Sequence, residues 1–171
     1  MPVGMQEWTL TLRDGVRVRV REYRPEDAPA LRRMFGRLSD RTRYLRYFGP
    51  TKELPRQKLR RFAGPDGKKR LGLVALDPED PREIIAFVCY DREGEEAAAE
   101  YAAVVEDRYQ GRGLGLGMTR LLVGEARRRG IRHLYALVLP ENRRMLGLLR
   151  KLELPDELRW EDGVERVEMR L

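Results

Sequence analysis

The residues of this sequence best suited to chemistry are the glycines and the glutamine at positions 110–115. The segment reads Gln110-Gly111-Arg112-Gly113-Leu114-Gly115, and it lies between an apolar run and a stretch of helical periodicity. Glycine is needed where a ligand approaches the backbone closely or where φ is positive. Such a turn leaves N–H groups free at a helix N-terminus, where the helix dipole also favours an anion. The segment therefore predicts a phosphate-binding turn.

Two common phosphate-binding patterns do not fit this turn. A G-x-G-x-x-G fingerprint that starts at Gly111 ends on Leu116, and one that starts at Gly113 ends on Met118. No Gly-Lys-Ser or Gly-Lys-Thr is present for a nucleotide P-loop. The pattern that fits is Gln/Arg-x-x-Gly-x-Gly/Ala. A glycine-rich connection that only turns the chain is the alternative interpretation.

This last pattern is the pyrophosphate signature of the GNAT acetyltransferase superfamily, which the sequence resembles at Gln110, Gly113 and Gly115. The segment 141–152 is also similar to the superfamily's helix beside the CoA thiol arm. Asn142 stands where the family motif Asn-x-x-Ala/Met contacts the cofactor, and a helix cap is its alternative role. The resemblance covers about residues 16–171. It implies one N-acetyltransferase domain over 1–171 that binds acetyl-CoA.

A narrower resemblance connects the chain to bacterial protein lysine acetyltransferases. The segment 38–48 looks like their Ser-x-x-Ser/Thr-Arg-Tyr-x-Arg-Phe sequence, and 99–105 resembles their Ala-Glu-x-Ala-x-x-Val strand. In those enzymes the strand glutamate is the general base, and here that residue is Glu100. The alternative for 38–48 is an amphipathic basic helix that buries Tyr44 and Phe48. The alternative for Glu100 is a surface position on the polar face of a strand.

Acetyl transfer to nitrogen needs a neutral amine, and a carboxylate such as Glu100 can remove the ammonium proton. Glu106 and Asp107 are weaker candidates because we expect them to be solvated near the turn. We expect a backbone N–H near Val104 or Val105 to hold the oxyanion, and Arg112 to contact phosphate. The cofactor-binding set predicted from the sequence is Val104, Val105, Gln110, Gly111, Arg112, Gly113, Leu114, Gly115 and Asn142.

The sequence departs from the family at the general acid. Many members carry a tyrosine seven residues after the helix asparagine, and this chain has Leu149 there. A CoA thiol can leave as a thiolate, so an acid is helpful but not mandatory. Tyr135 is a possible substitute. An acyl-CoA sensor that does not catalyse transfer is therefore an alternative to an enzyme, and so is an acetyltransferase for a small amine or a protein N-terminus.

The elements around the turn predict an α/β (α+β) fold with a mixed, mostly antiparallel twisted sheet flanked by helices on both faces. A first strand follows the Asp14-Gly15 turn, and a helix opens at Pro25 with a short helix after Ser39. We expect a loop with one helical turn over 51–69. The remaining expected elements are strands at 70–76, 83–90 and 97–105, a helix at 115–129, a strand at 134–139, a helix at 141–152 and a strand at 164–171.

Composition narrows the class of protein further. The 171 residues carry a net charge of +7 and are rich in arginine, a bias that fits a high-temperature or GC-rich source as well as an anionic ligand. The arginines are spread along the chain, so the sequence does not indicate a nucleic acid as the partner. Cys89 is expected to be buried, and one histidine, His133, cannot form a metal cluster. We expect no metal, no membrane span, a cytoplasmic location and a protein lysine or small amine as acceptor.

Overall fold

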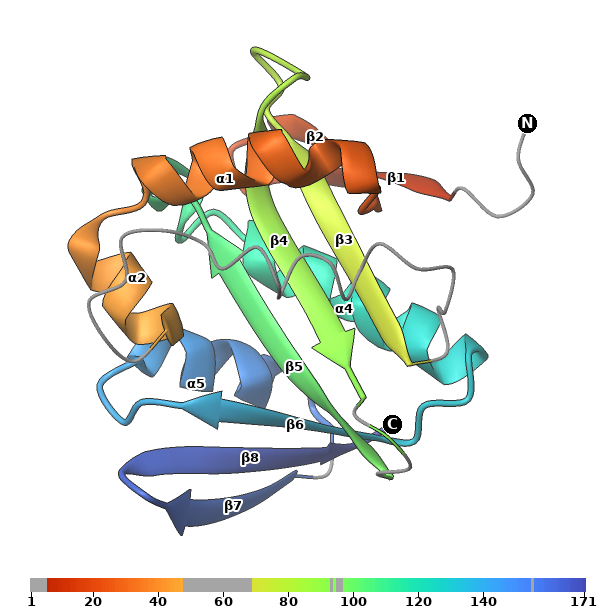
Figure 1. Ribbon diagram of the computed structural model, residues 1–171, viewed down its shortest axis with the longest axis vertical. Helices are drawn as coiled ribbons and strands as arrows, with labels where there is room; N and C mark the ends of the chain where they lie inside the picture. Colours follow the sequence, from red (N-terminus) through yellow and green to blue (C-terminus); the bar gives the residue numbers. More distant parts are fainter. Residues whose placement is uncertain (1–5, 48–68, 93, 95–96, 155) are drawn as a thin grey trace.

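The described part of the computed structural model, residues 6–47, 69–92, 94, 97–154 and 156–171, forms an eight-stranded sheet (Figure 1). The strand order is β1-β2-β3-β4-β5-β6-β8-β7, with β5 and β6 parallel and the other neighbours antiparallel. The strands are β1 Glu7–Thr11, β2 Arg17–Glu22, β3 Arg70–Leu76, β4 Ile84–Asp91, β5 Ala98–Val105, β6 His133–Val138, β7 Asp156–Glu161 and β8 Val164–Arg170. The helices are α1 Ala28–Arg37, α2 Asp40–Tyr47, α4 Leu114–Arg128 and α5 Arg143–Lys151, with 3-10 turns η1 Pro25–Asp27 and η2 Asp107–Tyr109.

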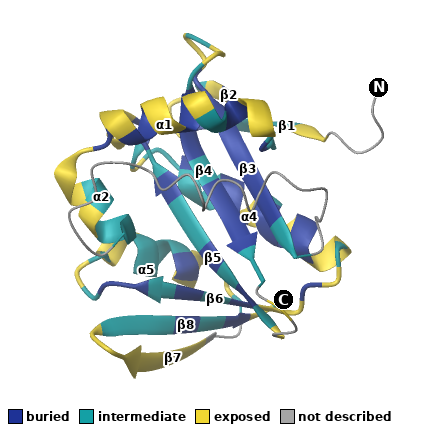
Figure 2. Cartoon of the chain, viewed as in Figure 1, coloured by how far each residue is buried: buried dark blue, intermediate teal, exposed yellow. Residues whose placement is uncertain are grey.

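Helices cover both faces of the sheet, as the sequence predicts. On one face α1 buries Leu31, Met34 and Phe35 against β3 and β4. On the other face α4 packs Met118 and Leu122 into a larger cluster with the strands. Both helices present apolar residues three or four positions apart, which is the spacing that places side chains on one helical face. The central strands are therefore buried on both sides, whereas β7 at one edge is exposed (Figure 2).

The elements expected from the sequence within the described residues are present with small shifts of their ends, but two edge strands were not predicted. β1 forms a hairpin with β2 through the turn at Gly15, where φ is 88°. β7 forms a hairpin with β8 through Asp162 and Gly163, which have φ values of 49° and 81°. An Asp-Gly pair with two positive φ angles is typical of a two-residue hairpin turn. The pattern needed to predict β7 was therefore present in the sequence.

The helical segment predicted near the N-terminus begins as a 3-10 turn. Pro25 opens η1, and α1 starts at Ala28. Ser39 caps α2, since its Oγ accepts a hydrogen bond of 3.1 Å from the backbone N–H of Thr42. The loop expected over 51–69, with its helical turn, lies outside the described residues except for Lys69.

The sheet opens between its two parallel strands. β5 and β6 are paired at Ala98↔His133, Ala99↔Leu134 and Glu100↔Tyr135. Beyond that point β5 stays paired with β4 as far as Val105, while β6 stays paired with β8. The two strands therefore diverge over their C-terminal halves. The C-terminal end of β5 leads into η2 and α4, and the C-terminal end of β6 leads into α5.

Candidate functional site

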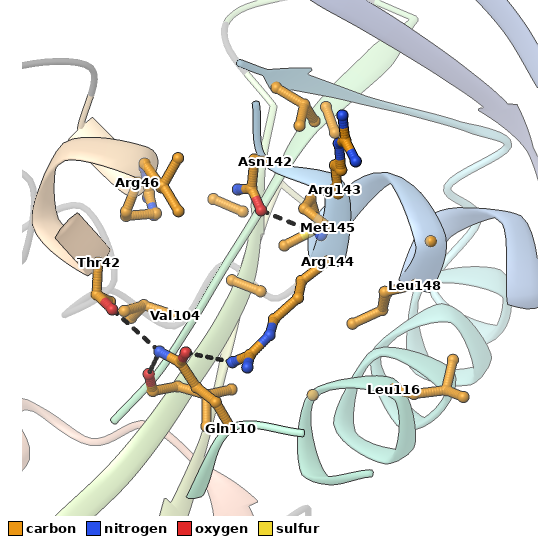
Figure 3. Close-up of a pocket in the computed structure, with 18 of the residues that line it drawn as sticks. Thr42, Arg46, Val104, Gln110, Leu116, Asn142, Arg143, Arg144, Met145 and Leu148 are labelled. Carbon is orange, nitrogen blue, oxygen red and sulfur yellow. Dashed lines mark hydrogen bonds between the residues drawn. The ribbon is translucent and has the colours of Figure 1, made fainter. Parts of the chain in front are cut away.

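The gap between the diverging strands is a cleft of about 580 Å³. Its wall is built from β5, β6, α2, the start of α4, one side of α5 and the β1–β2 turn (Figure 3). Most residues predicted from the sequence to bind the cofactor or to catalyse the reaction lie on this wall. These are Glu100, Val104, Val105, Gln110, Gly111, Gly113, Gly115 and Asn142, and the wall does not include Arg112 or Leu114.

The glycine-rich turn has the backbone conformation that the sequence suggests. Gly111 and Gly113 have φ values of 73° and 90°, which glycine adopts without the steric cost of a Cβ. Gly113 is the N-cap of α4, so the N–H groups of the first helical turn, residues 114–116, have no acceptor within the helix. The first turn of α4 carries no acidic side chain. The turn can therefore accept an anion at the helix N-terminus.

Gly115 allows the helix to approach the strands closely. A Cβ at this position would lie 3.2 Å from Cδ1 of Leu148 and 3.5 Å from Cγ2 of Val105. The first of these distances is shorter than ordinary van der Waals contact. The absence of a side chain here lets α4 start directly beside the end of β5 and the side of α5.

The Gln110 side chain bridges three elements of the cleft (Figure 3). Its amide nitrogen donates to the backbone oxygen of Val105 at 2.9 Å and to Oγ1 of Thr42 at 3.1 Å. Its amide oxygen accepts a bond of 2.6 Å from the Arg144 guanidinium. All of its hydrogen-bonding groups are thus used to join β5, α2 and α5. The structure gives Gln110 the role of an organiser of the turn.

Two predicted cofactor-binding residues face away from the cleft. The Arg112 guanidinium forms an ion pair of 2.6 Å with Asp14 in the β1–β2 turn and lies 4.8 Å from the centre of the Tyr109 ring. The Leu114 side chain is 1% exposed and packs in the core. Arg112 therefore holds the first hairpin against the turn, and Leu114 can offer a ligand only its backbone N–H.

Glu100 is the one carboxylate among the described residues of the cleft wall. It is half-buried on β5 between Ala99 and Tyr101. Its neighbours in register are Asp91 on β4 and Tyr135 on β6. Within the described part of the chain, the Glu100 carboxylate has no hydrogen bond and no ion pair. It is therefore available to accept a proton from a group in the cleft.

The open edge of β5 supplies main-chain donors. Glu106 donates its N–H to the oxygen of Ile85 on β4, at 2.8 Å. Because hydrogen-bonding directions alternate along an antiparallel strand, the N–H groups of Ala103 and Val105 point away from β4 and toward the cleft. Of the two residues expected from the sequence, Val105 offers its N–H to the cleft, whereas the N–H of Val104 is directed at β4.

Asn142 lines the cleft and also caps a helix. Its Oδ1 accepts a hydrogen bond of 3.1 Å from the N–H of Met145, so the capping interpretation is correct. Leu149, seven residues later, is 5% exposed in the core and does not line the cleft. Tyr135 lies 3.9 Å below the Arg166 guanidinium and is also absent from the cleft wall. Neither residue 149 nor Tyr135 therefore supplies a tyrosine hydroxyl to the cleft.

The two weaker acid candidates are engaged in structural contacts. Glu106 is 5% exposed and pairs with Arg37 and Arg108, so the expectation that it is solvated is wrong. Asp107 accepts hydrogen bonds of 2.9 Å from the N–H of Ser39 and of 2.9 Å from the Thr42 hydroxyl. This carboxylate anchors the start of α2 to the end of β5.

The basic-helix interpretation of 38–48 is wrong in one respect. Tyr44 is 44% exposed, so α2 does not bury it. Phe48 lies outside the described residues. The residues of α2 that line the cleft are instead Thr42, Leu45, Arg46 and Tyr47. Helical spacing brings Thr42 and Arg46 to one face, and that face turns toward β5.

Several cations on the cleft wall were not singled out from the sequence. They are Arg13, Arg46, Arg143, Arg144 and Lys151. They come from a hairpin turn and two helices that are distant in sequence, so no local motif could have assembled them. A wall with this charge attracts a polyanionic ligand.

The chain's one cysteine is not a nucleophile. Cys89 is 6% exposed on β4, and this burial raises the pKa of its thiol to about 12. It is therefore a neutral thiol at physiological pH, because the charged thiolate would be poorly solvated. Among the residues with assigned positions, no three His, Cys, Asp or Glu side chains group as metal ligands. No helix of this part of the chain has the length and apolar character needed to span a membrane.

Known proteins have similar sequences and similar folds. The family model for the acetyltransferase (GNAT) domain matches residues 17–154. An acetyltransferase of Pseudomonas aeruginosa is 36% identical over 143 residues, which are 82% of this chain and 76% of that relative. The crystal structure of the GNAT domain of S. lividans PAT is 35% identical, with a TM-score of 0.87, and the match covers 96% of this chain and 97% of that one.

A more distant neighbour shows the fold together with a ligand. It is a Salmonella typhimurium protein whose structure was determined with its cofactor acetyl-CoA. It is 15% identical with a TM-score of 0.65, and the match covers 89% of this chain and 91% of that one. At that identity the likeness is one of fold alone. The family model and the two closer relatives support a stronger conclusion: this chain belongs to the GNAT acetyltransferase family.

Proposed function

We propose that the protein transfers an acetyl group from acetyl-CoA directly to an amine, and that the amine is a lysine side chain of a protein. One observation carries this proposal. The helix N-terminus with its glycine turn lies on the wall of the same cleft as the Glu100 carboxylate, which has no ion pair or hydrogen bond among the described residues. The anion-binding end of the cleft suits the pyrophosphate of a CoA thioester. The proton-accepting end suits the amine that is to be acetylated.

The cleft fits acetyl-CoA by charge and by backbone geometry. The N–H groups at the start of α4, after Gly113, would hold the pyrophosphate. Arg13, Arg144 and Lys151 add positive charge to the same wall. The open edge of β5 offers N–H groups at Ala103 and Val105 to the pantetheine amides, as an added strand would use them. Acetyl-CoA supplies the activated acyl group as a thioester.

Glu100 would prepare the acceptor for attack. Its carboxylate takes the proton of the incoming ammonium, directly or through a water molecule, and leaves a neutral amine. The N–H of Ala103 or Val105 would stabilise the negative charge that develops on the carbonyl oxygen. The neutral nitrogen would attack the thioester carbon and form the C–N bond. As the C–S bond breaks, the sulfur would leave with the bonding electron pair and take up the second proton that the nitrogen loses, which yields the amide and the CoA thiol. Direct transfer is favoured over an acyl-enzyme because the thiol of Cys89 is buried and protonated.

A protein lysine is the preferred acceptor because the segments 38–48 and 99–105 resemble those of bacterial protein lysine acetyltransferases. An acetyltransferase for a small amine is the second candidate. An acyl-CoA sensor is the third, and it is favoured by Leu149 at the position of the usual acid. The cytoplasmic location stays a prediction from the sequence.

Calorimetry with acetyl-CoA, followed by an acetylation assay on lysine-containing proteins, tests the proposal. We expect Glu100→Gln to lower kcat by roughly 10²–10⁴-fold, the range for a general base, and to leave acetyl-CoA affinity unchanged. Glu165→Gln is the matched control, because Glu165 is a half-buried strand glutamate outside the cleft. Absence of acetyl-CoA binding would refute the proposal. Binding without turnover, unaffected by Glu100→Gln, would instead identify a sensor.

A further inference from the structure

Two opposite charges on the cleft wall have no charged partner among the residues that the structure describes. Glu100 on β5 and Arg46 on α2 both line the cleft. Within the described residues neither side chain has an ion pair or a hydrogen bond, and the one contact of the Arg46 guanidinium is with the Tyr47 ring, 4.8 Å away. Burying charge without a partner is unfavourable, so half-buried unpaired charges are uncommon unless a ligand uses them.

Arg46 lies at the Glu100 end of the cleft and away from the phosphate-binding turn. It follows Thr42 by one helical turn, and Thr42 contacts Gln110 at the turn (Figure 3). The positive charge of Arg46 also lowers the pKa of the Cys89 thiol, although burial of the thiol raises it more strongly. Cys89 is paired with Ala102, which shares a strand face with Glu100 two residues away.

Two other charged side chains around the cleft have polar partners. Asp91, the neighbour of Glu100 on β4, pairs with Arg70 at 2.9 Å. Arg144, another cation of the cleft wall, donates to Gln110. Arg143 and Lys151 of the cleft wall also have no ion pair among the described residues, but both are exposed, whereas Arg46 is half-buried like Glu100.

We propose that Arg46 is a carboxylate-binding residue, and that it and Glu100 together select an acceptor whose amine has a carboxylate close by. The ammonium approaches Glu100, and the carboxylate accepts charge-assisted hydrogen bonds from the Arg46 guanidinium, whose planar fork matches a carboxylate. An acceptor with an isolated positive charge would be repelled by Arg46. The inference rests on the proposed acetyl transfer, since it assigns Glu100 the amine.

The carboxylate has two possible sources on the acceptor. It is an Asp or Glu side chain beside the target lysine of a protein, or it is the α-carboxylate of a free amino acid. The test therefore uses three lysine peptides that differ in the flanking residue, which is Glu, Gln or Lys, and a parallel set of free amino acids. With the wild-type protein we expect kcat/KM to be roughly 10-fold or more higher for a carboxylate-bearing acceptor than for its neutral counterpart.

Substitutions at position 46 test whether the Arg46 guanidinium causes the preference for carboxylate-bearing acceptors. Arg46→Gln should remove the preference through a higher KM, and Arg46→Glu should reverse it toward the lysine-flanked peptide. Acetyl-CoA affinity should be unchanged in both variants. Arg41→Gln is the control, because it removes the same charge from an exposed position of α2 that does not line the cleft.

The outcomes separate this inference from the proposed function. Equal rates for all acceptors would overturn the role of Arg46 and leave acetyl transfer intact. A loss of acetyl-CoA affinity in Arg46→Gln would assign Arg46 to the cofactor and refute the inference. The same variants are also assayed with succinyl-CoA, whose acyl group carries a carboxylate. If Arg46→Gln lowered the rate with succinyl-CoA and left the rate with acetyl-CoA unchanged, Arg46 would bind the acyl group, and the acceptor assignment would be refuted. No acetylation of any acceptor by the wild-type protein would refute both proposals.

Discussion

The Arg144 guanidinium donates a hydrogen bond of 2.6 Å to the side-chain oxygen of Gln110, and this contact joins the first turn of α5 to the turn before α4. The two residues are 34 positions apart in sequence. Since the nitrogen of the same amide holds Val105 and Thr42, one side chain fixes the relative position of β5, α2 and α5 at the phosphate-binding end. The cleft is thus held in shape by polar contacts between its walls.

The Gln110–Arg144 contact should be measurable by a double-mutant cycle. We expect Gln110→Ala and Arg144→Ala to show a coupling free energy of about 0.5–1 kcal/mol in chemical denaturation, the lower range for a hydrogen bond because Arg144 is exposed. The pair Gln110→Ala and Arg150→Ala is the control, since Arg150 is an exposed arginine of the same helix that does not line the cleft. Equal coupling in both cycles would contradict the assigned role.

Gly113 should be intolerant of a side chain. Gly113→Ala places a Cβ on a residue with a φ of 90°, so we expect a loss of about 1 kcal/mol in the free energy of unfolding and weaker acetyl-CoA binding. Gly124→Ala in the same helix is the control, because a Cβ there would meet nothing within 4 Å. That substitution should stabilise the protein or leave it unchanged. Calorimetry and thermal denaturation of both variants check the prediction.

Stability at acidic pH should depend on Asp27. Burial raises the pKa of this carboxyl, but hydrogen bonds from Arg21 and from the N–H of Arg24 outweigh that effect and hold it below its ordinary value of 3.8. A carboxyl with a lowered pKa stabilises the fold above its unfolded-state pKa, and the contribution is lost as the pH falls through the folded-state pKa. We therefore expect the wild-type melting temperature to fall as the pH drops from about 4 toward 2.

Asp27→Asn should destabilise the protein by about 3 kcal/mol at neutral pH, because it leaves Arg21 half-buried without its partner. The variant should also lose the part of the acid dependence that Asp27 contributes. Asp40→Asn is the control, since the Asp40 carboxylate is fully exposed and its pair with Arg43 is 3.8 Å long, so we expect no measurable effect. Parallel acid profiles for the Asp27→Asn variant and the wild type would show that another carboxyl is responsible.

Introducing the family's tyrosine at Leu149 should not create a general acid. Leu149 lies on the buried face of α5 and is 5% exposed, so Leu149→Tyr would bury a larger ring and a hydroxyl group. We expect a loss of about 1–3 kcal/mol in stability and no gain in turnover. Leu158→Tyr, at a position 57% exposed on β7, is the neutral control. Higher kcat in Leu149→Tyr would show that this side chain reaches the cleft.

Local patterns in the sequence were sufficient to predict most of the helices, strands and turns of the fold. The helical spacing of Leu31, Met34 and Phe35 predicts the buried face of α1, and the structure confirms it. The β1 and β7 edge strands were missed because edge strands are half-exposed and carry charged residues, which weakens the alternation. The glycines at 111 and 113 predict a turn with positive φ, and φ depends on the residue's own backbone and its immediate neighbours.

The sequence by itself thus determined the family resemblance, the glycine turn and the strand that carries Glu100. Only the tertiary structure decided where Arg112 and Arg46 point. Arg112 belongs to the turn in sequence but pairs with Asp14 of the first hairpin, whereas Arg46 comes from a distant helix and lines the cleft. The direction of a long charged side chain depends on which partners the fold brings within reach, and those partners lie far away in the chain.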